Sequence, residues 1–179
     1  MALAPPASSA VRATFPALYD DHVDLAWRVL ARLGVAAPDL EDAVQDVFIV
    51  AHRRLAQFRG DSKLSTWVTG IAVRVAHDYR RRDARKPAEP LEPHEAALED
   101  RGVAPDDAVS RAQAGDLLAT LLARLEPSQR EVFVLAELEQ LSAPEIAELM
   151  GTPVNTVYSR LRLARERFNE GAAALRGEP

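Results

Sequence analysis

Hydrophobic residues recur at helical spacing along most of the chain. Near the N-terminus, steps of four and three residues separate the apolar positions Tyr19, Val23, Ala26, Leu30 and Leu33. One helical turn takes 3.6 residues, so these steps place the side chains on a single face. The sequence shows no strand-like alternation of apolar and polar residues. The pattern therefore predicts an all-α fold.

Two more helices are predicted before residue 87. Pro38 is a favoured first-turn residue and predicts the start of the second helix. Its apolar stripe consists of Leu40, Val44, Val47, Ala51, Leu55 and Phe58. Residues 58–62 break the pattern, and Ser62 is expected to cap the third helix. That helix carries Leu64, Trp67 or Val68, Ile71, Val75 and Tyr79, and a basic tail of Arg80, Arg81, Arg82, Arg85 and Lys86 follows it.

The segment 87–115 is predicted to be a flexible acidic linker. It places Pro87, Pro90, Pro93 and Pro105 among acidic residues and has no steady apolar stripe. Proline breaks helices, and so polar a composition buries too little apolar surface to fold. We therefore expect two small helical domains, an N-terminal one over residues 11–86 and a C-terminal one over residues 116–175.

The C-terminal domain ends in a predicted helix-turn-helix. Two helices precede it, the first marked by Leu117, Leu118, Leu121, Leu122 and Leu125, and the second starting at Pro127 and carrying Val132, Phe133, Leu135 and Ala136. Ser142 and Glu145 have capping-box spacing, and Gly151 suits the left-handed turn after a short helix. Thr152 and Pro153 are expected to cap and start the last helix. Its buried residues are Val154, Val157, Leu161, Ala164 and Phe168.

The polar face of the last helix is rich in arginine. With Val157 and Leu161 turned inward, a helical wheel points Asn155, Ser159 and Arg162 outward. Tyr158 and Leu163 lie beside them, and Arg160, Arg165 and Arg167 lie nearer the flanks. Outward residues early in such a helix reach base edges, while flanking arginines reach phosphates. The same pattern fits an ordinary helical hairpin with a solvated basic face.

The net charge of −5 is unevenly distributed along the chain. Residues 11–86 carry 13 Lys or Arg against 10 Asp or Glu, residues 87–115 carry 2 against 7, and residues 116–179 carry 7 against 10. The first block is therefore basic, the linker is strongly acidic, and the last block is mildly acidic with bunched arginines. This segregation is compatible with nucleic-acid binding despite the negative total.

Enzymatic and membrane functions find little support in the sequence. There are no cysteines, the four histidines lack metal-ligand spacing, and neither a Gly-rich phosphate loop nor a Gly-x-Ser-x-Gly elbow occurs. We therefore expect no catalysis, no cofactor and no bound metal. Charges interrupt every apolar stretch before it reaches membrane-spanning length, and residues 1–10 lack the basic start of a secretory signal. A soluble, cytoplasmic protein without membrane insertion is expected.

Two stretches of the sequence resemble a known family. Residues 144–165, PEIAELMGTPVNTVYSRLRLAR, resemble the C-terminal promoter-binding region of extracytoplasmic-function sigma factors in the sigma-70 family. An upstream block resembles the N-terminal region of the same family. It consists of the run DAVQDVF at 42–48, Phe58-Arg59-Gly60, Thr66-Trp67, Ile71-Ala72, and Asp78 before Arg81-Arg82. The resemblance covers roughly residues 15–86 and 115–170. Two matches in the family's order are more specific than either alone.

The resemblance implies an alternative sigma factor, which binds core RNA polymerase and directs promoter recognition, melting and transcription initiation. In the family the second N-terminal helix docks on polymerase, which implies contacts from Asp42, Gln45, Asp46 and Phe48. Phe48 lies off the main apolar stripe, so it could be an apolar anchor ringed by polar groups. The alternative is that Phe48 packs against the first helix.

The resemblance also implies two DNA-binding sites. The loop before the third helix and the outer face of that helix would capture one strand of the downstream promoter element. The residues implied there are Arg59, Gly60, Asp61, Ser62, Arg74, Asp78, Arg81 and Arg82. Trp67 falls on the apolar stripe, so we interpret it as a core residue rather than a base-stacking partner. The residues implied at the upstream element are Asn155, Tyr158, Ser159, Arg160, Arg162, Leu163 and Arg165.

Some residues depart from the family pattern. Arg74 stands where relatives commonly carry Asn, Tyr158 where they often carry Lys or Arg, and Leu163 where Arg is common. All three lie near expected DNA contacts, so the recognised promoter sequence does not transfer from relatives. With no sensing domain visible, we expect control by a separate anti-sigma inhibitor protein, as is common in the family.

Two rival functions explain less of the sequence. A freestanding helix-turn-helix regulator, dimerising through its N-terminal helices, would leave the match between Asp42 and Arg82 unexplained. A structural helical adaptor would leave the arginine-rich last helix unexplained as well.

Overall fold

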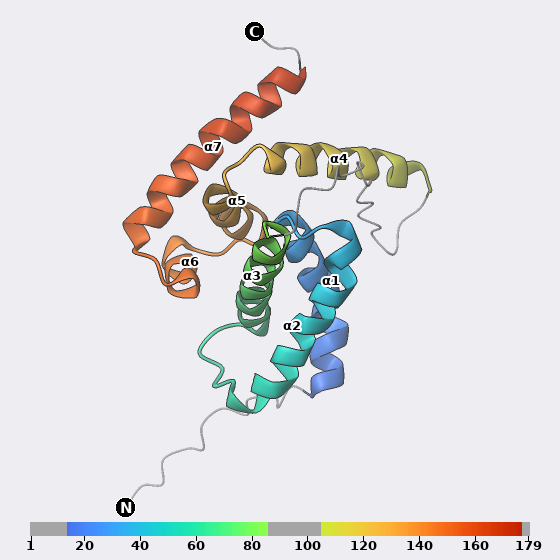
Figure 1. The fold of residues 1–179 in the computed structure, drawn as a ribbon, viewed down its shortest axis with the longest axis vertical. Coiled ribbons are helices and arrows are strands. Elements are labelled where there is room, and N and C mark those ends of the chain that lie inside the picture. The colour runs from blue at the N-terminus through green and yellow to red at the C-terminus, as the bar shows by residue number, and fades with distance from the viewer. Residues whose placement is uncertain (1–13, 86–104, 177–179) are drawn as a thin grey trace, which may run out of the picture.

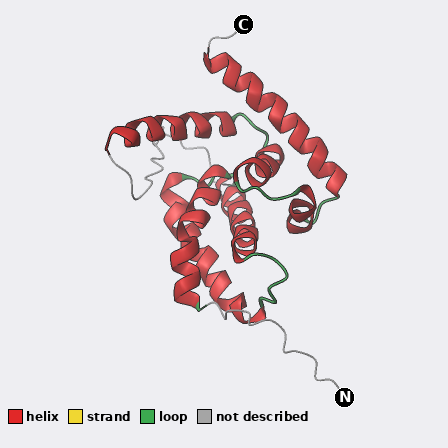
Figure 2. Cartoon of the chain, turned by 180° about the vertical axis from the view of Figure 1, so that it is seen from behind, coloured by secondary structure: helices red, strands yellow, loops and turns green. Residues whose placement is uncertain are grey.

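The computed structural model describes residues 14–85 and 105–176, and every regular element in that part of the chain is helical (Figures 1 and 2). This confirms the predicted all-α fold. The helices are α1 (Phe15–Arg32), α2 (Leu40–Arg54), α3 (Leu64–Asp83), α4 (Pro105–Ala123), α5 (Pro127–Phe133), α6 (Ala143–Met150) and α7 (Val154–Arg176). Three short elements join them, namely the 3₁₀ turns η1 (Ala37–Asp39) and η2 (Leu55–Gln57) and the π-helical turn η3 (Val134–Leu138).

The N-terminal half is a bundle of α1, α2 and α3. Helix α3 packs against both α1 and α2, so apolar side chains cover much of its surface. Its fully or nearly fully buried residues include Val68, Ala72 and Ala76. Trp67 packs in the same region with its ring centroid 5.3 Å from that of Phe58, as its place on the apolar stripe predicts.

The C-terminal half is organised around α5 and α7. The rings of Phe133 on α5 and Phe168 on α7 stack with centroids 4.6 Å apart. The short helix α6 inserts Ile146, which is fully buried, beside Val157 of α7. A tight turn joins α6 to α7, and α7 lies along the outer edge of the molecule (Figure 1).

The two halves meet through a continuous apolar core and several charged side chains. Arg32 of α1 donates to Glu139 at 2.9 Å, just after η3. His77 of α3 lies 2.8 Å from the carboxylate of Glu131 on α5, and Arg80 lies 3.8 Å from the same carboxylate. This arrangement could not be predicted from local patterns, because each pair joins residues more than fifty positions apart.

Several local predictions need correction. The predicted linker extends too far, because residues 105–115 belong to α4, for which Pro105 is a suitable first residue. Ser62 does not cap α3, whose N-cap is Lys63 without a side-chain hydrogen bond. Tyr19 is 41% exposed, and Leu18 takes its place in the core. Residues 87–104 of the linker, and residues 11–13 and 86 of the first domain, lie outside the described residues.

Two further predicted boundaries shift by a few residues. The last helix begins at Val154, one residue beyond Pro153. The arginines at 80, 81 and 82 form the last turn of α3 rather than a tail after it. No helix in the part of the chain that the structure describes is long and apolar enough to cross a membrane.

Candidate nucleic-acid and polymerase interfaces

Local signals fix the turn between α6 and α7. A capping box starts α6, in which Ser142 accepts from the Glu145 backbone and the Glu145 carboxylate accepts from the Ser142 amide at 2.8 Å. The hydrogen bonds from Ser142 lower the pKa of Glu145. At the other end, Gly151 has φ of 60° and the amide of Thr152 donates to the carbonyl of Ala147 at 2.9 Å. This left-handed closure sends the chain directly into α7.

Helix α7 buries one face and exposes the other. Val157 and Ala164 have no exposed surface, whereas Tyr158 is 56% and Leu163 is 38% exposed. Five of the predicted upstream contacts therefore lie on the open side of the helix, namely Asn155, Tyr158, Ser159, Arg162 and Leu163. Arg160 is half-buried at one flank, and Arg165 is exposed at the other. The arrangement fits a recognition helix, and the DNA contacts themselves remain predictions.

Three arginines of α7, Arg162, Arg165 and Arg167, have carboxylate partners on the protein. Arg162 pairs with Glu166 one turn later at 2.5 Å, and both side chains are more than half exposed. Arg165 contacts Glu137 on η3 at 2.6 Å. Exposed pairs of this kind contribute about 0.2–1 kcal/mol, so a DNA phosphate or base can replace them at small cost.

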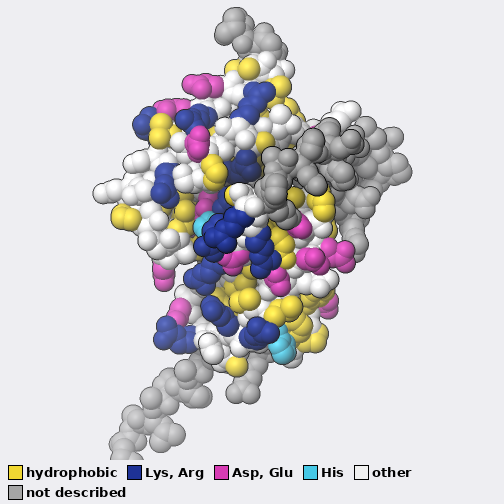
Figure 3. All heavy atoms as spheres, viewed as in Figure 1, with side chains coloured by type: hydrophobic (Ala, Val, Ile, Leu, Met, Phe, Trp, Pro, Cys, Tyr) yellow, Lys and Arg dark blue, Asp and Glu magenta, His cyan; other side chains and the backbone are white. Residues whose placement is uncertain are grey.

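The eight predicted contacts to the downstream element are all exposed. Arg59 and Asp61 pair across the loop at 3.1 Å, and Gly60 between them has φ of 78°, which glycine adopts without strain. On α3, Arg81 pairs with Asp78 one turn before it. Figure 3 shows Lys and Arg side chains gathered over the part of this face that α3 occupies. Loop and helix together offer a positively charged edge.

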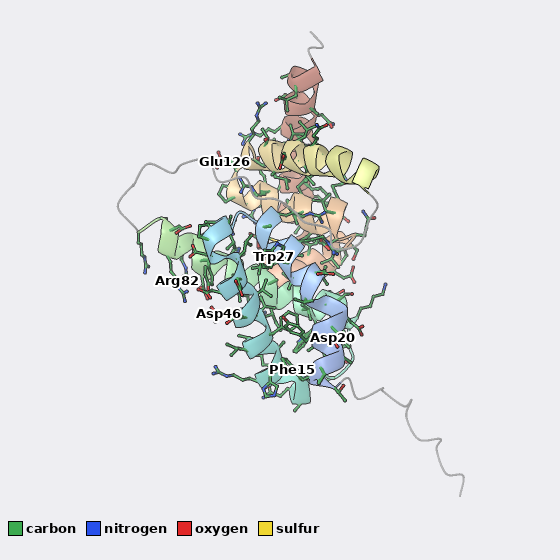
Figure 4. The ribbon with its side chains drawn as sticks, turned by 90° about the vertical axis from the view of Figure 1, so that its right-hand side faces the viewer. Phe15, Asp20, Trp27, Asp46, Arg82 and Glu126 are labelled. Atoms are coloured by element: carbon green, nitrogen blue, oxygen red, sulfur yellow. The ribbon has the colours of Figure 1, made fainter. Side chains whose placement is uncertain are left out.

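The predicted polymerase contacts on α2 divide into two groups. Asp42 and Gln45 are exposed, whereas Phe48 is 3% exposed. The Phe48 ring lies 4.7 Å from that of Tyr19 and 6.5 Å from that of Phe15, both on α1. Of the two alternatives for Phe48, the structure therefore shows the second: in the free chain its side chain packs against the first helix. Asp46 is half-buried and accepts a hydrogen bond from Tyr79 of α3 at 2.9 Å (Figure 4).

An apolar hollow of about 480 Å³ lies between α1 and α2, beside Phe48. Its exposed apolar side chains are Tyr19 and Ile49, which are 41% and 46% exposed. Neither residue was predicted to be part of an interface, and Tyr19 was placed on the apolar stripe of the first helix. The exposure of Ile49 could have been predicted. It follows the buried Val47 by two residues, which is a rotation of about 200° around the helix axis, so its side chain points to the opposite side of α2.

No group of three or more His, Asp or Glu side chains in the described residues is arranged to hold a metal ion. The His77 and Glu131 pair instead joins the two halves of the protein.

Comparison with known proteins gives two family matches. Residues 18–86 match the family described as Sigma-70 region 2, and residues 115–168 match the family described as Sigma-70, region 4. Together the two matches cover more than half of the chain, in the predicted order.

Relatives and solved structures agree with these matches. The ECF RNA polymerase sigma-E factor of Haemophilus influenzae is 34% identical over 139 residues, covering 74% of each chain. The protein of the same name from Escherichia coli K12 is 35% identical over 139 residues, covering 74% of this chain and 73% of the relative. Among solved structures, RpoE of Bartonella quintana with the anti-sigma factor NepR has a TM-score of 0.69 at 22% identity, covering 88% and 96% of the two chains. CnrH with the cytosolic domain of CnrY has a TM-score of 0.63 at 24% identity, covering 89% and 88%.

Proposed function

The chain belongs to the sigma-70 family, in its extracytoplasmic-function group, and from that premise we propose which of its surfaces carries each part of the function. It is an alternative RNA polymerase sigma factor that binds core polymerase and directs promoter recognition, melting and transcription initiation. The observation that carries this conclusion is the ordered pair of matches over residues 18–86 and 115–168.

We propose that α2 provides the contact with polymerase. Asp42 and Gln45 lie exposed on it, and the hollow beside them offers Ile49 and Tyr19 as apolar surface. Interfaces gain most of their affinity from apolar side chains ringed by polar groups, which is the arrangement here. Phe48 supports this surface from beneath, because it is buried against α1.

The downstream promoter element is assigned to the 59–62 loop and the exposed edge of α3. A loop carrying Arg59 and a helix end carrying Arg81 and Arg82 supply cations that can follow a single strand. Trp67 supports the loop through Phe58 rather than stacking on a base.

The upstream promoter element is assigned to the open face of α7. Arg162 lies opposite Val157 and Leu161, so it faces the major groove when the buried side rests on the domain. Arg160 and Arg165, on the two flanks, face the phosphates. Asn155, Tyr158, Ser159 and Leu163 complete this surface.

The domain boundaries and regulation belong to the same proposal. The N-terminal domain covers residues 11–86, and the C-terminal domain covers residues 116–175 with α4 extending it toward Pro105. The chain contributes no catalysis of its own and works in the cytoplasm, where polymerase is. A separate anti-sigma protein controls it, which is supported by the shared fold with a sigma factor that was solved with its anti-sigma factor.

Gel shift of promoter fragments with and without core polymerase tests this function. A sigma factor is expected to shift promoter DNA sequence-specifically only together with core enzyme, and to support run-off transcription from it. A specific shift by the chain alone, with no effect of added polymerase, would instead support the freestanding regulator. Absence of any shift under either condition would support the structural adaptor.

A further inference from the structure

Asp46 and Arg82 lie on different helices and are joined through Tyr79. The Tyr79 hydroxyl donates to the Asp46 carboxylate at 2.9 Å. The guanidinium carbon of Arg82 lies 4.9 Å from the centroid of the same ring. Figure 4 shows Asp46 on α2 and Arg82 at the end of α3 on the same side of the protein. A single aromatic ring therefore connects a side chain on α2 with a side chain on the predicted DNA-binding edge.

The environment of Tyr79 keeps its hydroxyl a donor. The side chain is 9% exposed in the core between α2 and α3. Burial raises the pKa of the Tyr79 phenol, and the hydrogen bond and negative charge of Asp46 raise it further, against the positive charge of Arg82, which lowers it. A phenol that stays protonated donates continuously, and a hydrogen bond to a charged carboxylate is stronger than one to a neutral acceptor. Packing in the core fixes the plane of the ring, and the hydrogen bond to Asp46 holds the hydroxyl end of the side chain toward α2.

The fixed ring can in turn fix Arg82. An exposed arginine has about 2 kcal/mol of rotamer entropy to lose when a ligand orders it. A guanidinium held over an aromatic face has lost part of that freedom in advance. Arg81, its neighbour on the same turn of α3, pairs with the exposed Asp78, and no ring of the described residues lies beneath it. The two adjacent arginines are therefore held by different means.

We propose that Asp46 and Tyr79 are positioning residues that hold the Arg82 guanidinium ready for the promoter DNA backbone. This inference rests on the proposed function, because it takes Arg82 as a DNA contact. It changes the role of Asp46, which acts inside the chain on Arg82 rather than as a direct contact with polymerase. Asp42 and Gln45, which are more exposed, keep the polymerase role.

The proposal is tested with full-length variants in complete holoenzyme. Tyr79→Phe keeps the ring and the packing but removes the hydroxyl, and Asp46→Ala removes the acceptor. Each is expected to weaken holoenzyme binding to promoter DNA about two- to fivefold, the range of an exposed cation–π contact. Tyr79→Phe should leave the affinity for core polymerase unchanged. Arg82→Ala is expected to lower the salt slope of DNA binding by about one unit, as loss of one phosphate contact does.

Non-additivity distinguishes positioning from a general structural role. In the Arg82→Ala background, Asp46→Ala and Tyr79→Phe should have no further effect on DNA binding, because the side chain that they position is gone. Additive losses would overturn the proposal, as would loss of polymerase affinity in Asp46→Ala with DNA binding intact.

A measurement on the free protein separates the inference from the proposed function. Relaxation of the arginine side-chain Nε–H groups by NMR should show Arg82 losing order in Asp46→Ala and Tyr79→Phe, while Arg81 is unchanged. Unchanged order at Arg82 would overturn the positioning role even if Arg82 binds DNA. Lost order at Arg82, combined with a silent Arg82→Ala in DNA binding, would instead remove Arg82 from the proposed DNA surface.

Discussion

Helices α3 and α7 both present arginines at surfaces assigned to promoter DNA, but the protein holds them in different ways. Helix α3 packs between α1 and α2 and buries eight side chains, so its DNA-facing residues are confined to one edge and its C-terminal end. Helix α7 fully buries Val157 and Ala164 and leaves the opposite side open. An edge beside a loop suits capture of a displaced strand, whereas an open helix face suits insertion into a groove.

The largest expected difference between the two helices is in stability. Ile71 of α3 is 3% exposed, and replacing a buried Ile by Ala typically costs about 2–5 kcal/mol. Leu163 of α7 is 38% exposed, and Leu163→Ala should stay within about 0.5 kcal/mol. Urea unfolding followed by circular dichroism measures both. Equal losses would show that α7 is buried in solution and that the contrast is wrong.

Helix α3 also contacts the other half of the protein through charged side chains. Glu131 of α5 is 3% exposed and faces His77 and Arg80 of α3. Even so, one oxygen of Glu131 and one nitrogen of Arg80 are buried without a hydrogen-bond partner among the described residues. Unpaired buried polar atoms cost about 1–3 kcal/mol each, so this junction is held less firmly than an apolar core.

Neutralising the acidic side of that junction should therefore separate the halves. The sequence has no cysteine, so dyes can be placed at Gln57→Cys and Leu175→Cys without interference. Energy transfer between them is expected to fall when Glu131→Gln and Glu139→Gln are combined, because hydrogen bonds to charged groups contribute about 1.5–3 kcal/mol each. Asp78→Asn, whose partner Arg81 is on the same helix, is the matched control. Unchanged transfer in the double variant would mean that the apolar contacts alone hold the halves together.

On α7, the central and flanking arginines should behave differently. A bidentate arginine on guanine contributes about 1–3 kcal/mol of discrimination, whereas a phosphate contact weakens all sequences alike. Arg162→Ala is expected to relax preference at one or two base pairs of the upstream element in the polymerase complex. Arg165→Ala should weaken binding with preference intact. Competition binding across variant upstream elements measures both effects, and the reverse pattern would move the recognition face toward Arg165.

A smaller effect is expected from the carboxylates that pair with these arginines. Exposed pairs one helical turn apart contribute about 0.3–0.5 kcal/mol. Glu166→Gln, which frees Arg162, should therefore tighten promoter binding by about twofold at low salt and less at high salt. Titration of holoenzyme against labelled promoter at two salt concentrations detects this. Weaker binding in Glu166→Gln would show that Glu166 orients Arg162 rather than competing with DNA for it.

The smallest expected effect is at Tyr158, which is 56% exposed beside Arg162. It lacks the positive charge common at this position in relatives, so its contribution would be ring packing on a base or sugar. Tyr158→Phe keeps the ring and should be nearly silent in initiation assays, whereas Tyr158→Ala should not. A large loss in Tyr158→Phe would show that the hydroxyl makes a required hydrogen bond.

The helix-turn-helix could be predicted closely because its signals are local. The capping box of Ser142 and Glu145 and the left-handed Gly151 each depend on residues a few positions apart. The inward and outward sides of α7 follow from periodicity for the same reason. Helix ends were less accurate, since Lys63 rather than Ser62 precedes α3 and Pro105 starts a helix instead of breaking one.

Features that depend on distant residues could not be predicted. Periodicity places Phe48 off the main stripe of α2, but only the approach of Phe15 and Tyr19 from α1 buries it. The Asp46 and Tyr79 hydrogen bond joins positions 33 residues apart. Glu131 looks like a surface residue in the sequence, and the packing of α3 against it makes it one of the most buried charges in the described chain.

The division of work between α3 and α7 is tested most directly by run-off transcription with core polymerase on two promoter libraries. One library is randomised at the upstream element and the other at the downstream element. Arg162→Ala is predicted to change the preferred sequences in the upstream library alone, and Arg59→Ala to change those in the downstream library alone. A change in both libraries with either variant, or a uniform loss of activity with Arg162→Ala, would contradict the assignment of one promoter element to each helix.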